Sequence, residues 1–243
     1  MAAREPRVVA VLLAGGMGSR FGGSVPKQLA PLASDTVMAH SLAALEEAPC
    51  VSEVVVVANP AWKQEIVNEA MRVVRTKPLL IADGGTSRNA SLRNALAQIE
   101  GDEARVLIHD AVRPLVTVEL IELVAHSLLT ASCVLPAVRS SDLLVEVEAG
   151  RANAFLSRDQ VLLGQSPQGF SLALLRATFA AENDQLTLQL PTLFEAVSAV
   201  LPGTAITVVD GLPENIKITQ PVDHMIAQRL LENRHPSLRR EEL

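Results

Sequence analysis

The chain has 243 residues and a formal net charge of −6, from 21 Lys and Arg against 27 Asp and Glu. A dedicated nucleic-acid-binding protein would carry an excess or a stripe of basic residues, so this balance argues against that class. Hydrophobic residues make up 49% of the chain and aromatic residues only 2%. This composition is typical of a folded domain with an aliphatic core, and it excludes aromatic base stacking as the main mode of binding.

The cysteines and the apolar runs indicate the cellular compartment of the protein. Cys50 and Cys133 lie far apart and lack the spacing of a metal site, so we expect free thiols in a reducing compartment. The apolar run at residues 8–13 is too short for a signal peptide, and no stretch approaches the ~20 apolar residues of a membrane span. We therefore expect a cytoplasmic protein with no membrane partner.

Short runs rich in β-branched residues alternate with helical patterns. Buried strands are expected at residues 8–13, 53–58, 78–82, 105–109, 133–138 and 205–209, and helices at 36–46, 60–74, 87–99 and 117–129. Strands that are apolar almost throughout are covered on both faces, as in parallel sheets. The order predicts a Rossmann-like, doubly wound α/β fold with a mostly parallel sheet, in a single domain over 1–243.

A glycine-rich segment follows the first strand directly. Residues 13–23 read LAGGMGSRFGG, and Pro26, Lys27 and Gln28 come soon after. Glycines let the backbone turn tightly and present N–H groups to a polyanion, at the sheet edge where open α/β folds bind ligands. Arg20 and Lys27 add charge suited to phosphates. The spacing fits neither the Rossmann dinucleotide pattern nor the Walker A loop.

Two further polar motifs follow the third and fourth strands. Residues 83–91 read DGGTSRNAS, in which Ser87 is a good N-cap for the next helix. Residues 109–114 read HDAVRP, where Asp110 could orient a sugar hydroxyl or bind magnesium and Arg113 could contact a phosphate. The alternative is structural: Asp110 caps a turn and pairs with Arg113. For His109, a satisfied core histidine is favoured over a catalytic role.

One later segment breaks the alternation of strands and helices. Residues 143–148 and an extended run near 153–163 flank a turn at 149–151, which is the signal of a β-hairpin. The two strands have no obvious surface of their own subunit to cover. We therefore expect a dimerisation arm at about 140–164 that packs on a second subunit of a homodimer. The alternative is a short two-stranded lid on the same chain.

The pattern LAGGxGxR followed by PKQ resembles the sugar-phosphate nucleotidyltransferases. Its PKQ version is similar to the cytidylyltransferase branch that contains 2-C-methyl-D-erythritol 4-phosphate cytidylyltransferase and ribitol-5-phosphate cytidylyltransferase. The resemblance runs from residue 8 to about residue 231. It implies transfer of CMP from CTP to a polyol phosphate, with Mg2+ held largely by the CTP phosphates and Asp110 as a candidate ligand. A non-catalytic nucleotide-binding protein is the alternative, against which the retained Arg20, Lys27 and Lys217 speak.

The resemblance also implies roles for individual residues. It assigns catalysis, through stabilisation of the reacting phosphates, to Arg20, Lys27 and Lys217. The CTP-binding residues that it implies are Leu13, Ala14, Gly15, Gly16, Gly18, Ser19, Asp83, Gly84, Gly85, Arg88, Ser91 and Asp110. The acceptor-binding residues that it implies are Arg113, Ser141, Arg158 and Ser166, with Ser141 supplied by the neighbouring subunit.

Two departures from the family pattern bear on the acceptor. Residues 139–142 read RSSD where the family carries Asp-Thr, and Phe194 stands at the position of an Asp in the family's Thr-Asp-Glu. The motifs LAGG, HDAVRP and GQSP look closer to the ribitol-5-phosphate enzymes. We therefore expect D-ribitol 5-phosphate as the acceptor, with 2-C-methyl-D-erythritol 4-phosphate as the alternative.

Overall fold

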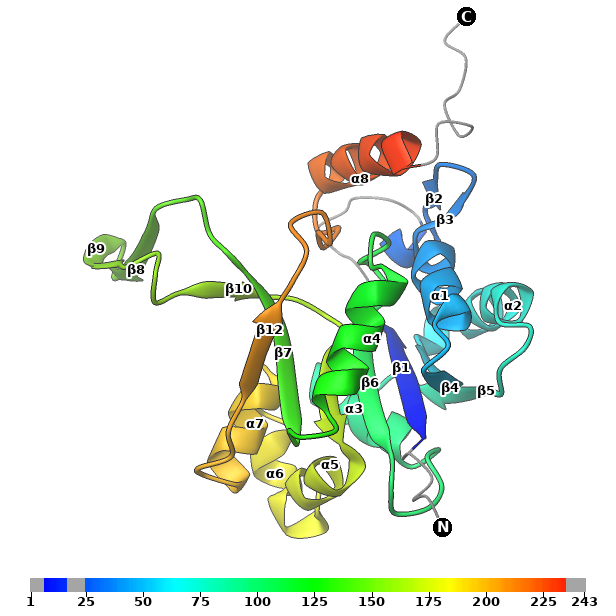
Figure 1. Ribbon diagram of the computed structural model, residues 1–243, viewed down its shortest axis with the longest axis horizontal. Coiled ribbons are helices and arrows are strands. Elements are labelled where there is room, and N and C mark those ends of the chain that lie inside the picture. The colour runs from blue at the N-terminus through cyan, green and yellow to red at the C-terminus, as the bar shows by residue number, and fades with distance from the viewer. Residues whose placement is uncertain (1–6, 17–24, 235–243) are drawn as a thin grey trace, which may run out of the picture.

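A mixed β-sheet with helices on both faces forms the body of the protein (Figure 1), in a computed structural model that describes residues 7–16 and 25–234. The strand order is β10-β7-β11-β6-β1-β4-β5, with β12 paired to β7. The strands are β1 (Val8–Ala14), β4 (Val51–Ala58), β5 (Leu79–Asp83), β6 (Arg105–Asp110), β7 (Cys133–Arg139), β10 (Leu162–Gly164), β11 (Gln168–Ser171) and β12 (Thr207–Asp210). Pairing is parallel except at β10 and β11. The expected mostly parallel α/β sheet is therefore confirmed.

Alternate residues of each central strand face two separate hydrophobic cores. In β1, Val8, Ala10 and Leu12 belong to one core and Val9 and Val11 to the other. The first core lies under α1 (Val37–Glu47), α2 (Lys63–Val73) and α4 (Val118–Ser127), and the second lies under α3 (Arg88–Leu96), α5 (Leu172–Thr178) and α7 (Leu193–Val200). Burial on both faces explains why these strands read as unbroken apolar runs.

Hydroxyl side chains set the starts of the predicted helices. Thr36, Ser87 and Thr117 each accept a hydrogen bond from a backbone N–H of the first turn of α1, α3 and α4. Such caps satisfy backbone donors that have no partner within the helix. The expected helix at 60–74 begins as a 3-10 turn at Pro60–Trp62 and continues as α2.

The segment between the arm and the last parallel strand contains elements that the sequence did not predict. Strand β11 inserts antiparallel between β6 and β7, and α5, a 3-10 turn (Ala181–Asn183), α6 (Asp184–Thr187) and α7 follow it. Phe194, at the position of the missing Asp, packs its ring against Phe170 of β11, with centroids 5.3 Å apart. Thr192 and Glu195 form a capping box at the start of α7. The five elements from β11 to α7 are too short to show a clear period in sequence.

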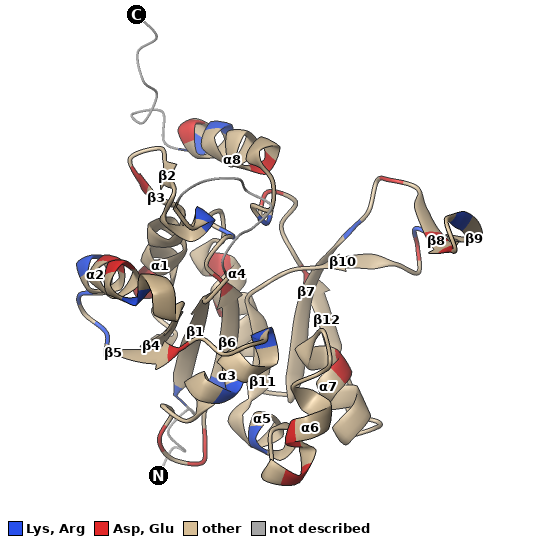
Figure 2. Ribbon diagram, turned by 180° about the vertical axis from the view of Figure 1, so that it is seen from behind, with Lys and Arg blue, Asp and Glu red and all other residues tan. Residues whose placement is uncertain are grey.

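The expected hairpin is present and projects from the body (Figures 1 and 2). Strands β8 (Leu144–Glu148) and β9 (Arg151–Leu156) pair with each other alone, across a turn in which Ala149 and Gly150 have φ of 46° and 78°. The expectation of one extended run over 153–163 was wrong. Strand β9 ends at Leu156, and residues 162–164 form β10, which returns to the central sheet beside β7.

A third, smaller core carries the C-terminal helix over one end of the sheet. Ala227 and Leu231 of α8 (Pro221–Arg234) pack with Leu32, Leu115 and Ile218. The short strands β2 (Pro31–Leu32) and β3 (Asp35–Thr36) and the 3-10 turn Lys27–Leu29 lie on this side. Residues 215–219, which carry Lys217, form neither a helix nor a strand. In the part of the chain that the structure describes, no helix is both long and apolar enough to cross a bilayer.

Candidate active site

A cleft of about 400 Å³ opens at the carboxyl ends of β1 and β6. The lining residues are Leu13, Ala14, Gly15, Gly16, Lys27, Gln28, Gly85, Thr86, Ser87, Arg88, Ser91, Asp110, Val112, Lys217 and Thr219. They come from five separate segments, which the parallel strand order brings to one edge of the sheet. This is the edge at which open α/β sheets bind ligands.

One wall of the cleft is the loop that connects β5 to α3. The Gly85 N–H donates to Ser91 Oγ at 2.9 Å, and the Ser91 hydroxyl donates to the Ser87 carbonyl at 2.9 Å. A Cβ atom on Gly85 would lie 2.6 Å from the Cβ of Ala90. The loop therefore lies flat against the start of α3, an approach that only glycine permits.

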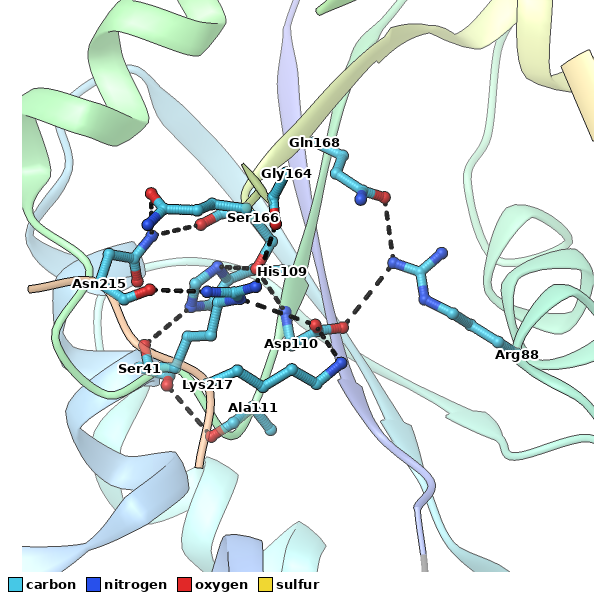
Figure 3. Close-up of polar contacts among 12 residues, drawn as sticks. Ser41, Arg88, His109, Asp110, Ala111, Gly164, Ser166, Gln168, Asn215 and Lys217 are labelled. Carbon is cyan, nitrogen blue, oxygen red and sulfur yellow. Dashed lines mark hydrogen bonds and ion pairs between the residues drawn. The ribbon is translucent and has the colours of Figure 1, made fainter. Parts of the chain in front are cut away.

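Positive charge surrounds a single carboxylate in the cleft (Figure 3). Asp110 lies 2.9 Å from Lys217 Nζ, 3.7 Å from the Arg88 guanidinium and 3.9 Å from that of Arg113. Burial works against ionisation, but the opposing charges, that of Lys217 foremost, hold the pKa of Asp110 at about 2. Lys27, Arg88 and Lys217 against Asp110 leave the lining of the cleft cationic. Such a cleft suits a polyphosphate ligand.

His109 lies behind Asp110 and is completely buried. Its Nε2 is 3.2 Å from the Arg113 carbonyl oxygen and its Nδ1 is 3.0 Å from Ser166 Oγ. Because a carbonyl only accepts hydrogen bonds, Nε2 must carry the proton, and the Ser166 hydroxyl donates to Nδ1. Burial lowers the pKa of His109 to about 4, so the ring is neutral near pH 7. The interpretation of His109 as a satisfied core histidine agrees with these contacts.

Arg113 and Ser166 belong to one hydrogen-bond network next to Asp110, of which Figure 3 labels Ser166 and Asn215. Arg113 donates to the Asn215 carbonyl at 2.6 Å and to the Gly164 carbonyl at 3.3 Å, and Asn215 Nδ2 donates to the Ser166 carbonyl at 2.7 Å. The Ser166 hydroxyl also accepts the Asp110 backbone N–H at 3.1 Å. The network ties the segment that carries Lys217 to the ends of β6 and β10, which fixes Lys217 and Asp110 relative to each other.

The cleft brings together most, but not all, of the residues that the sequence singled out. Lys27, Lys217 and eight of the expected CTP-binding residues line it: Leu13, Ala14, Gly15, Gly16, Gly85, Arg88, Ser91 and Asp110. Asp83 instead pairs with Lys63 at 2.6 Å, and Gly84 donates to the Ala58 carbonyl behind the cleft. Gly18, Ser19 and Arg20 lie outside the described residues.

The expected acceptor-binding residues divide into two groups. Arg113 and Ser166 lie beneath the cleft, and Ser166 is 1% exposed with its hydroxyl already bonded. Ser141 and Arg158 are exposed at the two ends of the hairpin arm and do not line the cleft of their own chain. Their binding roles stay predictions.

Sequence reasoning missed Gln28, Thr86, Val112 and Thr219 as cleft residues, and it expected Ser87 only as a helix cap. All but Thr219 belong to motifs quoted above, and Thr219 is two residues from Lys217, so proximity was the available signal. Val112 is apolar and gives no chemical hint, whereas Gln28 is part of the PKQ motif and is 2% exposed.

The cleft fits a metal that is held mainly by its ligand. Among residues 7–16 and 25–234 there is no group of three or more His, Cys, Asp or Glu that could hold a metal ion. Asp110 is the one carboxylate in the described lining of the cleft. Magnesium commonly binds through one or two carboxylates and substrate phosphates, so this donor set is compatible with a nucleotide-borne Mg2+.

Comparison with known proteins agrees with this geometry. The model of the family IspD, 2-C-methyl-D-erythritol 4-phosphate cytidylyltransferase, matches residues 8–233. A protein of that name from Thermobifida fusca is 38% identical over 94% of this chain and 94% of its own, and one from Cereibacter sphaeroides is 37% identical over 91% and 96%. The crystal structure of 4-diphosphocytidyl-2C-methyl-D-erythritol synthase from Anaerococcus prevotii superposes with a TM-score of 0.78 at 22% identity, over 93% of this chain and 99% of the other. The chain therefore belongs to the IspD family and is a cytidylyltransferase, a nucleotidyltransferase enzyme.

Proposed function

We propose that the protein transfers CMP from CTP to 2-C-methyl-D-erythritol 4-phosphate and releases pyrophosphate. The observation that carries the chemistry is the cationic cleft, in which Lys217 and Arg88 lie beside Asp110 and Lys27 also lines the wall. The acceptor rests on the relatives, which are named for 2-C-methyl-D-erythritol 4-phosphate. The expectation of D-ribitol 5-phosphate, which rested on motifs such as LAGG and GQSP, finds no support in them, because none of the relatives compared above is named for that acceptor.

The reaction needs charge stabilisation more than proton transfer. The nucleophile is a phosphate oxygen that is already anionic, so no general base is required. Two polyanions must approach, and negative charge grows on the α-phosphate in the transition state. Fixed positive charge lowers that barrier because it is oriented before the reaction begins. Lys27 and Lys217 supply this charge in the cleft, and Arg20 would hold the leaving pyrophosphate.

The two glycine-containing walls would hold the nucleotide. Residues 13–16 form one wall and the loop at 85–91 the other, and both present backbone to the cleft. Backbone N–H and carbonyl groups recognise a base edge without a long side chain. We place cytosine against the loop at 85–91 and the triphosphate along residues 13–16, toward Lys27. Mg2+ would be held by the triphosphate with Asp110 as its protein ligand, where it neutralises phosphate charge.

The acceptor site would be completed by a second subunit. Ser141 and Arg158 are exposed on the arm and distant in sequence from every residue that lines the cleft. In a homodimer whose arms cross, they would reach the partner's cleft, close to Arg113. The exposed apolar side chains of the arm support this arrangement, since Phe155 is 69% and Val147 63% exposed in the single chain.

A comparison of two acceptors tests the proposed substrate. With saturating CTP and Mg2+, kcat/KM is measured for 2-C-methyl-D-erythritol 4-phosphate and for D-ribitol 5-phosphate by pyrophosphate release. Leaving one buried polar group unpaired costs about 1–3 kcal/mol, so we expect at least a roughly tenfold preference for the first. Equal values, or a preference for ribitol 5-phosphate, would contradict the proposed acceptor but not the CTP chemistry.

A further inference from the structure

Three consecutive carbonyl groups of the turn after β1 accept hydrogen bonds from buried side-chain amides. Gln28 Nε2 donates to the Ala14 carbonyl at 2.8 Å and to the Gly16 carbonyl at 2.9 Å. Asn59 Nδ2 donates to the Gly15 carbonyl at 2.8 Å. Both amides are buried, with Gln28 2% and Asn59 7% exposed. Side chains from two other segments therefore hold the three carbonyl groups.

The fold explains how these amides reach the turn. β1 and β4 are parallel neighbours in register, with Ala14 beside Ala58, so Asn59 emerges next to Gly15. Asn59 Oδ1 is in turn fixed by the Ala61 N–H at 2.9 Å. Gln28 lies in the 3-10 turn Lys27–Leu29, directly after Lys27. The same short turn thus carries a cleft lysine and the amide that binds the glycine-rich segment.

The direction of a carbonyl also determines the direction of the next N–H. A peptide bond is planar and trans, so the N–H of each unit points opposite to its carbonyl. Because Gln28 holds the Ala14 carbonyl, the Gly15 N–H points away from Gln28, and because Asn59 holds the Gly15 carbonyl, the Gly16 N–H points away from Asn59. Glycine has little intrinsic preference among conformations, so without such bonds the peptide units of this turn could reorient at low cost.

We propose that Gln28 and Asn59 are positioning residues, which hold the peptide units of residues 14–16 in the orientation that binds the CTP phosphates. The amide of Gln28 suits this role because its two N–H bonds serve two carbonyls at once. A carboxylate of the same shape would repel both. The inference rests on the proposed use of CTP, and it assigns to the Gln of PKQ a task separate from that of Lys27.

The test uses near-isosteric variants that remove donors alone. Gln28→Glu and Asn59→Asp keep the shape of each side chain, and Asn59→Asp still accepts the Ala61 N–H. Gln28→Met removes the donors without burying a charge, in case Gln28→Glu fails to fold. Gln64→Glu and Asn68→Asp are matched controls, because those two amides bond only each other on the exposed face of α2. Circular dichroism and thermal unfolding identify the folded variants.

Binding of CTP and of CMP is then measured by calorimetry. In the folded variants, we expect the Kd for CTP to rise about tenfold or more and the Kd for CMP to rise clearly less. The reason is that backbone N–H groups of the turn lose their orientation, and CTP has more phosphates that they can bind than CMP has. The controls should match the wild type. A Kd for CTP within twofold of the wild type would overturn the inference, as would equal losses for CTP and CMP. Turnover of the wild type with 2-C-methyl-D-erythritol 4-phosphate is scored separately, so failure of the proposed acceptor leaves this result readable.

Discussion

Two lysines of this chain lie in contrasting surroundings, one at a helix end and one in the cleft where we propose catalysis. Lys77 Nζ donates to the Leu45 and Ala48 carbonyls at 2.8 and 2.6 Å, at the carboxyl end of α1. Carbonyls at a helix end have no partner within the helix, so this contact belongs to folding. Lys27 lines the cleft beside the glycine-rich turn, where a positive charge faces the expected triphosphate.

Removal of each lysine should therefore have opposite consequences. Lys27→Met should lower kcat by about 10²–10³, the usual effect of losing one contact to transition-state charge, and leave the Tm nearly unchanged. Lys77→Met should lower the Tm and leave kcat/KM nearly unchanged. Steady-state kinetics and thermal unfolding of both variants check this. Near-normal turnover of a folded Lys27→Met protein would refute the catalytic role.

His109 makes a prediction about pH. Its pKa is about 4 in the folded protein against an ordinary value of 6.5, so between these values the unfolded chain binds a proton that the native state does not. The free energy of unfolding should therefore be unaffected by this group above about pH 6.5 and should fall as the pH drops toward about 4.

The prediction is checked by urea unfolding at about pH 7, 6 and 5. His109→Gln should show a shallower loss of stability over this range than the wild type, although it is less stable at about pH 7 because the Ser166 contact is altered. His126→Gln, at an exposed position, should keep the slope of the wild type. A wild-type slope in the His109 variant would mean that another group is responsible.

At the scale of elements, the arm exposes apolar side chains that a monomer would leave in contact with water. Val145 pairs with Phe155 across the hairpin, and both side chains are exposed. A two-stranded hairpin is at best marginally stable alone in water, and exposed apolar patches of this kind mark interfaces. In the proposed dimer, a second copy of the chain covers these apolar side chains.

Charges placed on the apolar pair should separate the subunits. The double variant Val145→Glu and Phe155→Glu should sediment as a monomer that still binds CTP but has lost at least about tenfold in kcat/KM for the acceptor, because buried charge opposes association. Glu148→Gln, on the same hairpin, should remain a dimer. A wild-type protein that sediments as an active monomer at assay concentration would contradict the role of the arm.

The elements that could be predicted from sequence are those whose pattern is local. The strand at 53–58 is apolar because both its faces are buried, and Thr36, Ser87 and Thr117 mark helix starts by their chemistry. Strand β11 could not be predicted, because one buried phenylalanine in four residues gives no period and its position between β6 and β7 depends on tertiary packing. Likewise, nothing local shows that residues 162–164 leave the arm for the central sheet.

The site could be predicted where its residues directly follow strands that the sequence predicts. Motifs after the first, third and fourth strands converge because parallel strands share one carboxyl edge. What could not be read was the orientation of side chains within the motifs. Ser166 and Arg113 proved to be tied into the network beneath Asp110, and Asn215 joins them through contacts that span about 50 and about 100 residues of sequence.

At the scale of the whole molecule, positive charge is gathered in the cleft at the carboxyl ends of β1 and β6 and not spread over one face of the protein. Figure 2 shows Lys and Arg scattered among Asp and Glu over the helices. The charges that matter are local to Asp110, in agreement with a small polyanionic substrate and not a nucleic acid. In the proposed reaction, this cleft joins the α-phosphorus of CTP to the phosphate of a polyol.

The most direct measurement is phosphorus NMR of one reaction mixture that contains the protein, CTP, Mg2+ and 2-C-methyl-D-erythritol 4-phosphate. We expect the CTP and acceptor signals to fall together, while pyrophosphate and two mutually coupled phosphorus signals of a new P–O–P linkage rise in equal amounts. A folded Lys27→Met protein should give the same product at a rate lower by about 10²–10³. Release of orthophosphate and CDP, or CTP that stays intact beside an unchanged acceptor, would contradict the proposed transfer of CMP.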